Sequence, residues 1–411
     1  MLYKDRIQLQ IERLEQVPEP DDAAIDHSEL LYQKIVAQIN QRPFSFSEFM
    51  HQLLYAPGLG YYSAGSTKIG PAGDFITAPE LSPLFGHCLA VQAQQVLGDG
   101  CADMLEFGAG TGRLAVAIMS YLAAVDDLPD HYFILEPSPD LQQRQQDLIK
   151  TECPEQMERF VWITELPETF AGVIIANEVL DAMPVNIFKV ADDGIEEMQV
   201  AVSEAGELHP QFTTDISPEL ADWWVTTGRN LGLPNEYESE VNLAVNPWIE
   251  SLANCLTKGL IILIDYGFPM SEYYLPERST GTLKCHYRHR HHNDPFVLLG
   301  LQDVTAHVDF TAVAEAGFES GLDVLGYVNQ AGFLTSCGIL QMAENELPVQ
   351  VEASEDSGLK QQLLLSQQIK PLIMPEEMGE LFKVIALGKD IDSVDLGGLI
   401  GFRYLDQRRL L

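Results

Sequence analysis

Basic residues are scarce in this 411-residue sequence. It contains 24 Lys and Arg against 61 Asp and Glu, which gives a formal net charge of −37 and an isoelectric point near 4.4. A chain with this charge repels a phosphate backbone, so nucleic acid is a poor candidate as a partner. The charge favours a cationic partner instead.

Long apolar runs and paired cysteines are missing as well. The sequence has no run of 18 apolar residues, and its first 16 residues interrupt apolar positions with charge every two or three residues. These features predict neither a membrane span nor a signal peptide. The six cysteines lie far apart with no C-x-x-C pair, which favours a reducing compartment. We therefore expect a cytoplasmic protein with no membrane insertion.

Strand-like and helix-like segments alternate from residue 103 onward. Short apolar runs predict strands at 103–107, 131–135, 160–163, 173–176, 260–264, 323–325 and 382–387. Periodic apolar patterns predict helices at 28–40, 45–55, 84–97, 114–124, 139–152, 247–256 and 309–316. This alternation is typical of parallel β-α-β units, so we expect an α/β fold.

A glycine-rich turn follows the first predicted strand. Its sequence, E-F-G-A-G-T-G, begins at Glu106 and contains Gly108, Gly110 and Gly112. Glycine lets the backbone approach a ligand, while the following helix presents free N–H groups to it. The dinucleotide fingerprint G-x-G-x-x-G needs a small residue at the next position, where this chain has Arg113. The turn therefore favours S-adenosylmethionine, and an NAD-dependent oxidoreductase is disfavoured.

The second predicted strand ends at Glu136, which lies 24 residues after Gly112. In nucleotide-binding α/β folds a carboxylate at this place holds the ribose hydroxyls. We therefore expect Glu136 to bind the ribose of the cofactor, although an NAD site would use the same residue.

Two carboxylates and an amide follow the fourth predicted strand, in the sequence A-N-E-V-L-D-A. They are Asn177, Glu178 and Asp181. Ligands bind outside the carboxyl ends of the strands in an open parallel sheet, so these side chains should face the reactive end of the cofactor. A carboxylate pair suits a guanidinium, whose planar fork donates two parallel hydrogen bonds. For Asp181 the alternative is that it caps a helix beginning at residue 182 or 183.

Two further segments carry polar side chains. Tyr266 follows the strand at 260–264 and could line the acceptor pocket, within a long loop predicted at 266–305. Four histidines in that loop show no ordered ligand spacing, so we expect no metal site; they are His286, His289, His291 and His292. The loop is expected to close over the substrate or cofactor, or to be exposed to solvent.

Several of these segments together resemble the MidA-like family of methyltransferases, which includes a mitochondrial arginine methyltransferase that assists complex I assembly. The matching segments are Tyr61-Tyr62, G-D-F-I-T-A-P-E at 73–80, L-E-F-G-A-G-T-G at 105–112, A-N-E-V-L-D-A at 176–182, I-D-Y-G at 264–267, T-A-H-V-D-F at 305–310 and M-G-E-L-F-K-V at 378–384. The resemblance spans about residues 28 to 389. Two departures are Pro83, where the family usually has Gln, and Val179-Leu180, where it usually has Phe-Phe.

The resemblance implies a class I (Rossmann-like) methyltransferase with a mostly parallel seven-stranded sheet, an N-terminal helical extension and an inserted subdomain. It implies S-adenosylmethionine as donor and the ω-nitrogens of a protein arginine, such as one in a respiratory-complex subunit, as acceptor. The catalytic candidates are Asn177, Glu178 and Asp181. The cofactor-binding candidates are Glu106, Gly108, Gly110, Gly112, Glu136, Asp74 and Glu80, and the substrate-binding candidates are Tyr266 and His307.

The expected domain boundaries follow the same motifs. A polar, loosely held lead-in at 1–26 precedes N-terminal helices and a cofactor-covering loop at 27–100, and the methyltransferase domain at 101–389 precedes a peripheral tail at 390–411. Residues 184–245 are too long for an ordinary crossover and predict an insertion, with a hairpin turning at 192–194 and a helix near Trp223. A non-enzymatic assembly factor that retains the cofactor-binding fold is the alternative to an enzyme. The acceptor protein, the number of methyl groups added and the oligomeric state are not predicted.

Overall fold

The computed structural model describes residues 3–14, 17–63, 76–98, 100–345, 365–391 and 398–411. Contacts divide the chain into two compact units. Unit 1 comprises Met1–Phe75, Leu180–Val245 and Met270–Asp309, and unit 2 comprises Ile76–Val179, Asn246–Pro269 and Phe310–Leu411. These units divide the chain differently from the predicted boundaries, because unit 1 combines the N-terminal residues with the predicted insertion and with part of the predicted loop.

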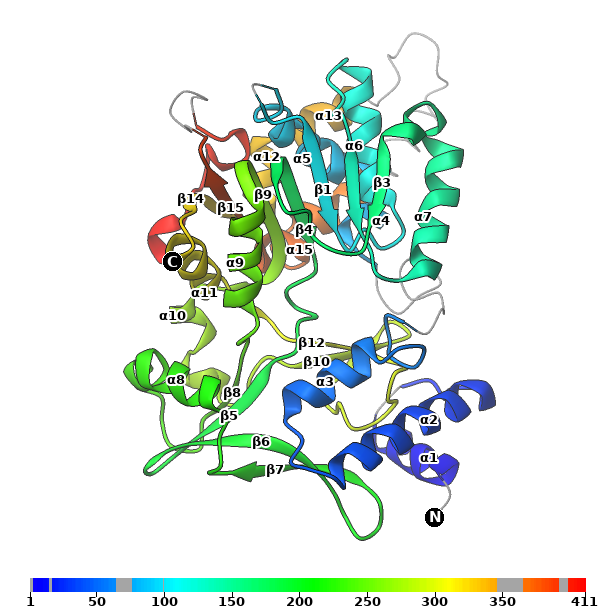
Figure 1. Cartoon of the computed structure of the whole chain (residues 1–411), viewed down its shortest axis with the longest axis vertical. Helices are drawn as coiled ribbons and strands as arrows, with labels where there is room; N and C mark the ends of the chain where they lie inside the picture. Colours follow the sequence, from blue (N-terminus) through cyan, green and yellow to red (C-terminus); the bar gives the residue numbers. More distant parts are fainter. Residues whose placement is uncertain (1–2, 15–16, 64–75, 99, 346–364, 392–397) are drawn as a thin grey trace. The chain divides into compact units, whose positions relative to one another are not determined.

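Unit 2 is built on a sheet in which seven strands follow one another (Figure 1). Their order is β14 (Asp323–Asn329), β15 (Phe382–Lys389), β9 (Leu256–Phe268), β4 (Phe170–Asn177), β1 (Asp103–Phe107), β2 (Tyr132–Leu135) and β3 (Phe160–Ile163). The five strands from β9 to β3 are parallel, and β15 is antiparallel to both of its neighbours. The prediction of an α/β fold with a mostly parallel sheet is therefore confirmed.

The central strands of this sheet are buried on both faces. In β4 the side chains from Val173 to Ala176 have no exposed surface, and the same holds from Leu260 to Ile264 in β9. Such continuous apolar runs are typical of parallel strands that helices cover on both sides. The helices of unit 2 include α4 (Ala78–Leu81), α5 (Pro83–Gln94), α6 (Arg113–Ala124), α7 (Pro139–Glu152), α9 (Val245–Cys255), α11 (Phe310–Glu319), α12 (Gln330–Ser336), α13 (Ile339–Asn345) and α15 (Met378–Leu381).

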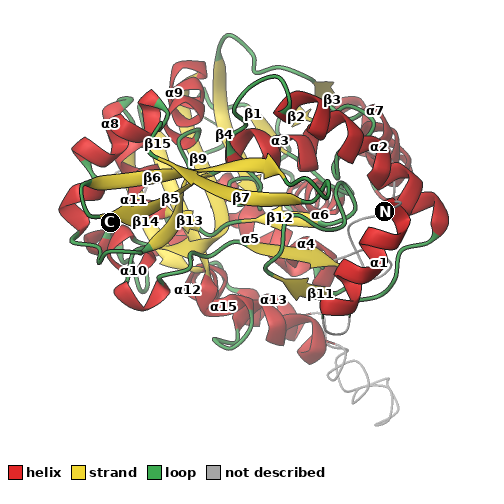
Figure 2. Cartoon of the chain, turned by 90° about the horizontal axis from the view of Figure 1, so that it is seen from below, coloured by secondary structure: helices red, strands yellow, loops and turns green. Residues whose placement is uncertain are grey.

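Unit 1 contains two small antiparallel sheets and a helical N-terminal region (Figure 2). One sheet has the order β7 (Leu208–Thr213), β6 (Gly194–Val202), β5 (Asn186–Ala191) and β8 (Glu238–Val241), and the other has the order β11 (Arg290–His292), β10 (Lys284–Tyr287) and β12 (Asp303–Thr305). The helices are α1 (Tyr3–Arg13), α2 (Asp22–Ile39), α3 (Phe46–Tyr55), α8 (Pro218–Thr226) and α10 (Met270–Tyr273).

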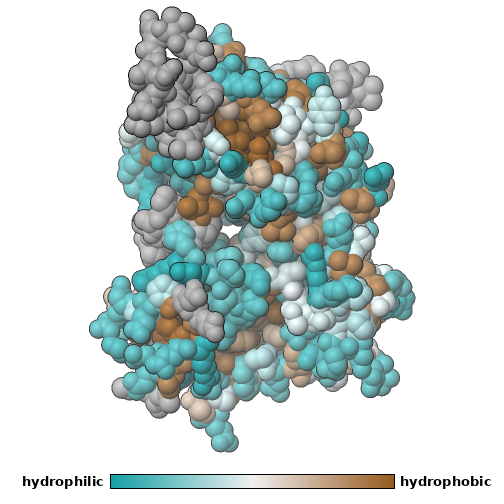
Figure 3. All heavy atoms as spheres, turned by 180° about the vertical axis from the view of Figure 1, so that it is seen from behind, coloured by the Kyte–Doolittle hydropathy of each residue, from teal (hydrophilic) through white to brown (hydrophobic). Residues whose placement is uncertain are grey.

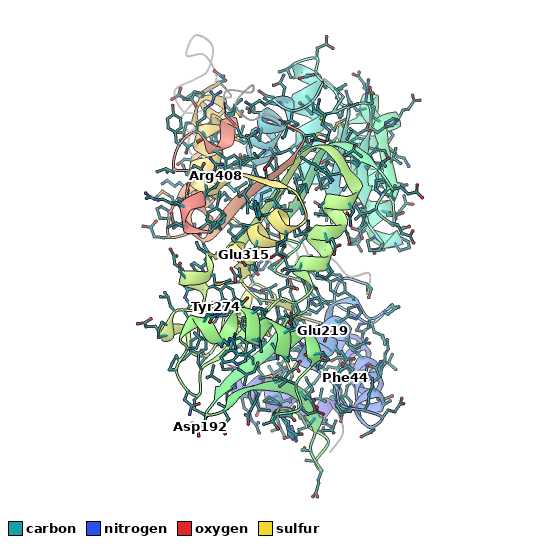
Figure 4. All side chains as sticks on the ribbon, turned by 60° about the vertical axis from the view of Figure 1, so that its left-hand side comes forward. Phe44, Asp192, Glu219, Tyr274, Glu315 and Arg408 are labelled. Carbon is teal, nitrogen blue, oxygen red and sulfur yellow. The ribbon has the colours of Figure 1, made fainter. Side chains whose placement is uncertain are left out.

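Two local predictions for unit 1 are confirmed. The hairpin turns where predicted, since Ala191 pairs with Gly194 between β5 and β6. The helix predicted near Trp223 is α8. The ring of Trp223 packs on Phe188 at 5.0 Å and on Tyr274 at 6.0 Å. Tyr274 is labelled in Figure 4. These aromatic contacts hold α8 against β5, so the insertion carries apolar packing of its own.

The N-terminal lead-in was predicted to be loosely held, and this prediction is wrong for its described part. Helix α1 buries Tyr3, Ile7 and Ile11 in an apolar cluster that also contains Val297 and Leu298. The spacing of four residues places the three side chains on one helical face. The charged residues of the segment lower its mean hydropathy, so this apolar face was not recognised in the sequence.

Helix α2 begins earlier than predicted, at Asp22 instead of residue 28. The side chain of Asp21 accepts a hydrogen bond from the N–H of Ala24 at 2.9 Å and so caps the helix. The polar cluster before it was interpreted as a loop, although Asp is among the preferred N-cap residues. The predicted capping box of Ser45 and Glu48 at the start of α3 is confirmed.

The loop predicted at 266–305 is also partly wrong, because it contains α10 and the sheet of β10, β11 and β12. Cys285 and Val304 face each other across β10 and β12, and both are fully buried. Strands of three or four residues give too little alternation to be predicted from the sequence alone. Among the described residues, no group of three or more His, Cys, Asp or Glu side chains is arranged to hold a metal ion.

The chain from residue 390 was expected to be peripheral, but its described end contributes to the core of unit 2. Leu399 and Phe402 are buried, and the ring of Phe402 packs on Phe333 at 5.5 Å. Tyr404 and Leu405 nearby are largely exposed. The face of the molecule shown in Figure 3 mixes hydrophilic side chains with apolar groups. In the part of the chain that the structure describes, no helix combines the length and apolarity needed to cross a membrane.

Candidate active site

The carboxyl ends of β1 and β4 lie side by side in unit 2. The two strands are parallel neighbours, and Phe107 pairs with Ala176 at their ends. The chain continues from β1 to β2 and β3 on one side, whereas β4 and β9 lie on the other, so the strand order reverses between β1 and β4. A ligand crevice forms outside the strands at such a switch point. The structure therefore brings the glycine turn next to Asn177 and Glu178.

The glycine turn between β1 and α6 has a backbone that only glycine adopts easily. The φ angles of Gly108, Gly110 and Gly112 are +59°, +53° and +90°. Gly112 is the N-cap of α6, so the first N–H groups of that helix have no partner within the helix and can face an anionic or polar ligand. The alternating glycines thus follow from the backbone of the turn.

Glu136 lies at the carboxyl end of β2, and its carboxylate is held by two neighbours. The N–H of Ser138 donates to Oε1 at 2.9 Å, and Nε2 of Gln145 donates to Oε2 at 3.3 Å. The side chain is buried, and burial raises the pKa of its carboxyl. The residue occupies the position at which nucleotide-binding sheets hold ribose hydroxyls.

Glu106 precedes the glycine turn on β1 and is buried below it. The hydroxyl of Tyr132 donates to its Oε2 at 2.7 Å. Burial raises the pKa of this carboxyl to about 7, opposed by the Tyr132 hydrogen bond and assisted by the charge of Glu136. Glu106 therefore links β1 to β2 directly beneath the turn.

Glu80 on α4 binds the glycine turn itself. The hydroxyl of Thr111 donates to one carboxylate oxygen, and Nε of Arg113 lies 3.1 Å from the other. The sequence alone offered Glu80 as a cofactor ligand, and both of its oxygens are engaged by the chain. Asp74, the other candidate from the same segment, lies outside the described residues.

Strand β4 ends at Asn177, and the next residue, Glu178, has an unusual backbone conformation. Glu178 has a φ of +53°, which is uncommon for a residue with a side chain and costs about 1–3 kcal/mol. Its N–H donates to the carbonyl of Ile264 at 2.9 Å, and its Oε1 accepts from Nδ2 of Asn177 at 3.1 Å. Oδ1 of Asn177 is buried and has no hydrogen-bond partner among the described residues. Strain and an unsatisfied polar atom at one place are typical of a functional site.

Asp181 belongs to unit 1 and is buried there. The chain turns at residues 181–183 and no helix begins there, so the helix-cap alternative for Asp181 is wrong. Its carbonyl accepts from the N–H of Ala306 at 3.0 Å, which brings the T-A-H-V-D-F segment beside it.

Tyr62, another residue of the family motifs, binds Asp303 in unit 1. It donates its hydroxyl to both carboxylate oxygens of Asp303 at 3.0 Å. Burial raises the pKa of Tyr62, and the charges of Asp303 and Asp181 raise it further.

The two substrate-binding candidates lie in different units. In unit 1 the N–H of His307 donates to Oγ1 of Thr282 at 3.0 Å, and the N–H of Thr282 donates to the buried carboxylate of Glu240. In unit 2 the ring of Tyr266 packs edge-on against Phe382 with centroids 5.3 Å apart. Tyr266 is near the end of β9, two residues after Ile264, the strand neighbour of Asn177.

The sequence reasoning missed two residues of this site, Gln145 and Trp162. Gln145 is fully buried on α7 and contacts both Glu136 and the glycine turn, while Trp162 on β3 donates to it. A signal existed in the sequence: Gln145 lies four residues from both Leu141 and Ile149, on the apolar face of an otherwise polar helix. A polar residue at such a position predicts a buried hydrogen-bonding partner.

The parallel sheet, the glycine turn at its switch point and the buried carboxylate at the end of β2 define a protein that binds an adenosyl nucleotide. Its residues 85–328 match the family described as "Putative S-adenosyl-L-methionine-dependent methyltransferase". The chain belongs to this family, and the resemblance to MidA-like methyltransferases is confirmed. S-adenosylmethionine is thus its methyl donor, and the cradle of three positive-φ glycines together with Glu136 fits that cofactor.

Known proteins similar to this chain agree with the assignment. A methyl transferase candidate from Burkholderia thailandensis, crystallised with S-adenosyl-homocysteine, is 39% identical with a TM-score of 0.88, over 96% of this chain and 100% of that one. The protein named "Protein arginine methyltransferase NDUFAF7, mitochondrial" of Danio rerio is 27% identical over 371 residues, covering 84% of this chain and 83% of its own length. The Homo sapiens protein of the same name is 27% identical over 379 residues, covering 84% and 80%.

Proposed function

We propose that this chain transfers a methyl group from S-adenosylmethionine to an ω-nitrogen of arginine in a protein substrate. The observation that carries the proposal is the Asn177–Glu178 pair, whose carboxylate and free amide oxygen adjoin the donor-binding turn. Both of these oxygens are hydrogen-bond acceptors, and a guanidinium has five N–H groups that can donate to them. Relatives named protein arginine methyltransferase support the same acceptor. A subunit of a respiratory complex is the substrate that the family resemblance favours.

The donor side of the proposed site comprises the glycine turn and four carboxylate residues, of which Asp74 lies outside the described residues. The turn approaches the cofactor through its backbone, and Glu136 binds the ribose hydroxyls. Glu106 supports the turn through Tyr132, and Glu80 supports it through Thr111 and Arg113. The complete set of proposed donor-binding residues is Asp74, Glu80, Glu106, Gly108, Gly110, Gly112 and Glu136.

In the proposed reaction the lone pair of the arginine ω-nitrogen attacks the methyl carbon. A nitrogen–carbon bond forms as the sulfur–carbon bond breaks, and the electron pair of that bond stays on sulfur, which gives S-adenosyl-homocysteine. The methylated nitrogen then loses one proton to solvent. Glu178 orients the guanidinium and stabilises its positive charge, so the residue acts mainly by positioning and electrostatics. Asn177 holds the Glu178 carboxylate through its Nδ2.

Asp181, Tyr266 and His307 are proposed to contribute to acceptor binding. Asp181 is a second carboxylate in the same sequence motif, three residues after Glu178, and a carboxylate can accept two parallel hydrogen bonds from a guanidinium. The ring of Tyr266 and the imidazole of His307 would contact the side chain or backbone of the substrate. A net charge of −37 favours a substrate segment with other basic residues and disfavours nucleic acid.

We also propose that the protein works in the cytoplasm. All six cysteines are free and buried, which is compatible with a reducing compartment. Fractionating cells that express the native protein tests this location, and recovery from a membrane or secreted fraction would contradict it.

The acceptor is tested by incubating the protein with labelled S-adenosylmethionine and an extract from cells that lack it. We expect one or a few labelled protein bands whose acid hydrolysate contains methylated arginine, and mass spectrometry then locates the site. Label on lysine or on a small molecule would overturn the arginine assignment. The absence of any labelled product would instead favour the non-enzymatic assembly factor.

A further inference from the structure

Gln145 makes three hydrogen bonds from a fully buried position on α7. Its Nε2 donates to the carbonyl of Gly110 at 3.1 Å and to Oε2 of Glu136 at 3.3 Å. Its Oε1 accepts from the indole Nε1 of Trp162 at 2.9 Å. One side chain therefore connects the turn after β1, the end of β2 and the middle of β3.

The orientation of this amide is determined by its partners. An indole N–H can only donate, so the Gln145 oxygen must face Trp162. A backbone carbonyl can only accept, so the amide nitrogen must face Gly110. The opposite orientation would point the amide oxygen at two other acceptors and the amide nitrogen at the indole N–H, which leaves buried polar groups without hydrogen bonds.

Gln145 also packs directly against the glycine turn. A Cβ atom added at Gly112 would lie 3.4 Å from both Cα and Cγ of Gln145. A side chain at position 112 would therefore touch Gln145, so helix α7 approaches the turn closely there as well as through the hydrogen bond at Gly110. Any displacement of Gln145 changes the separation between the turn and Glu136.

We propose that Gln145 is a positioning residue for the methyl donor. It holds the Gly110 carbonyl and the Glu136 carboxylate at a fixed separation, so that the turn and the ribose-binding carboxylate contact the same adenosyl ligand. Trp162 fixes the amide in the orientation that this requires. The proposal rests on the proposed ribose role of Glu136, and it assigns Gln145 an effect on ribose recognition beyond its effect on folding.

The test compares two ligands in the full chain by calorimetry: S-adenosyl-homocysteine and its 2′,3′-dideoxy analogue. The variant Gln145→Met keeps the side-chain length but removes all three hydrogen bonds. One of these hydrogen bonds is to the charged group of Glu136, so we expect roughly a tenfold or greater loss of affinity for S-adenosyl-homocysteine. The loss for the analogue should be several-fold smaller, because the analogue lacks the hydroxyls that Glu136 binds.

Two further variants keep the test informative if Gln145→Met lowers the stability of the protein. Gln145→Glu retains an oxygen for Trp162, and its ionised carboxylate cannot donate to Glu136 and repels it, so in alkaline buffer this variant should lose at least as much affinity as Gln145→Met. Trp162→Phe removes the N–H that orients the amide, together with part of the ring that packs near Phe160, and should lose roughly threefold. The matched control is Gln143→Met, the same change at an exposed position of the same helix, which should stay within twofold of the native protein.

The outcomes separate this proposal from the role of Glu136. If Glu136→Ala loses discrimination between the two ligands while Gln145→Met and Gln145→Glu retain it, the positioning role is overturned and the ribose role stands. Equal losses for both ligands in the Gln145 variants would indicate a purely structural role and also overturn the proposal. If Glu136→Ala binds both ligands as the native protein does, the ribose role fails, and the proposal fails with it.

Discussion

Unit 2 carries carboxylates at two places along the carboxyl edge of its sheet, and their surroundings differ. On the donor side, beside β1 and β2, Glu106 and Glu136 are buried and accept hydrogen bonds from fixed neighbours. On the acceptor side, at the end of β4, Glu178 has a positive φ and adjoins an amide oxygen that has no partner among the described residues. The donor side is satisfied by the chain itself, whereas the acceptor side retains strain and an open acceptor.

This difference corresponds to two kinds of ligand. Burial raises the pKa values of Glu106 and Glu136, because it disfavours the charged form of each carboxyl. Carboxyls of this kind suit a site that binds uncharged hydroxyls. A cationic acceptor instead requires oxygens that can accept its N–H groups, and at the end of β4 these are the carboxylate of Glu178 and Oδ1 of Asn177. The cost of the Glu178 conformation is therefore of the kind that functional sites retain for preorganisation.

Changing Glu to Gln at matched positions tests the comparison, and the largest effect is expected at the acceptor side. Glu178→Gln keeps the size of the side chain and its contact with Asn177 but removes the charge. We expect kcat/KM for methyl transfer to fall about 10²–10³-fold, because charge stabilisation in the transition state is lost. Affinity for S-adenosyl-homocysteine should stay within a few-fold. Transfer assays and calorimetry on the same preparation measure both quantities.

The control for this variant is Glu168→Gln, an exposed position just before the opposite end of β4. It should leave both transfer and donor affinity unchanged. Unchanged turnover in Glu178→Gln would contradict the guanidinium role of Glu178. A large loss of donor affinity would place Glu178 on the donor side and remove the distinction between the two edges.

A smaller effect, on stability, is expected for Glu106→Gln. The pKa of Glu106 is raised to about 7 in the folded chain and is about 4.5 in the unfolded chain. Between pH 4.5 and pH 7 the carboxyl is therefore protonated in the folded state and ionised in the unfolded state. The native protein therefore loses stability as the pH rises from about 4.5 through 7, up to about 3 kcal/mol. The variant lacks this loss, so its melting temperature relative to the native protein should rise between pH 5 and pH 8. A difference independent of pH would contradict the raised pKa.

The smallest effect is expected for Glu80→Gln. Thr111 can still donate to the new side chain, and only the ion pair with Arg113 is weakened. Since the Arg113 side chain is 45% exposed, this ion pair contributes at most about 1 kcal/mol. We expect a two- to five-fold loss of affinity for S-adenosyl-homocysteine, equalled by Arg113→Met. A tenfold or greater loss for Glu80→Gln alone would show that Glu80 contacts the donor directly.

The fold of unit 2 could be predicted because its signals are local and repeated. Each of its predicted strands is present, and the helix predicted at 139–152 is α7. The described part of unit 1 was predicted less well: α1, the start of α2 and the sheet of β10 to β12 were missed. These elements are short or polar, and burial against distant segments stabilises them more than their own pattern does.

Among the site residues, the predictable ones belong to single motifs. The glycine turn and the Asn177–Glu178 pair could be named because each occupies a few consecutive residues at the end of a strand. Gln145 and Trp162 were missed because their partners lie elsewhere in the chain. Gln145, for example, binds Gly110, which is 35 residues away.

By itself the sequence determined the features that depend on neighbouring residues. Steric limits on φ favour glycine at positions 108, 110 and 112, and a reciprocal pair three residues apart caps α3. Tertiary structure alone decided which distant groups meet, such as Tyr62 with Asp303 across 241 residues. Dihedral limits and capping bonds act over one helical turn, whereas these contacts exist only after strand order and packing have brought the segments together.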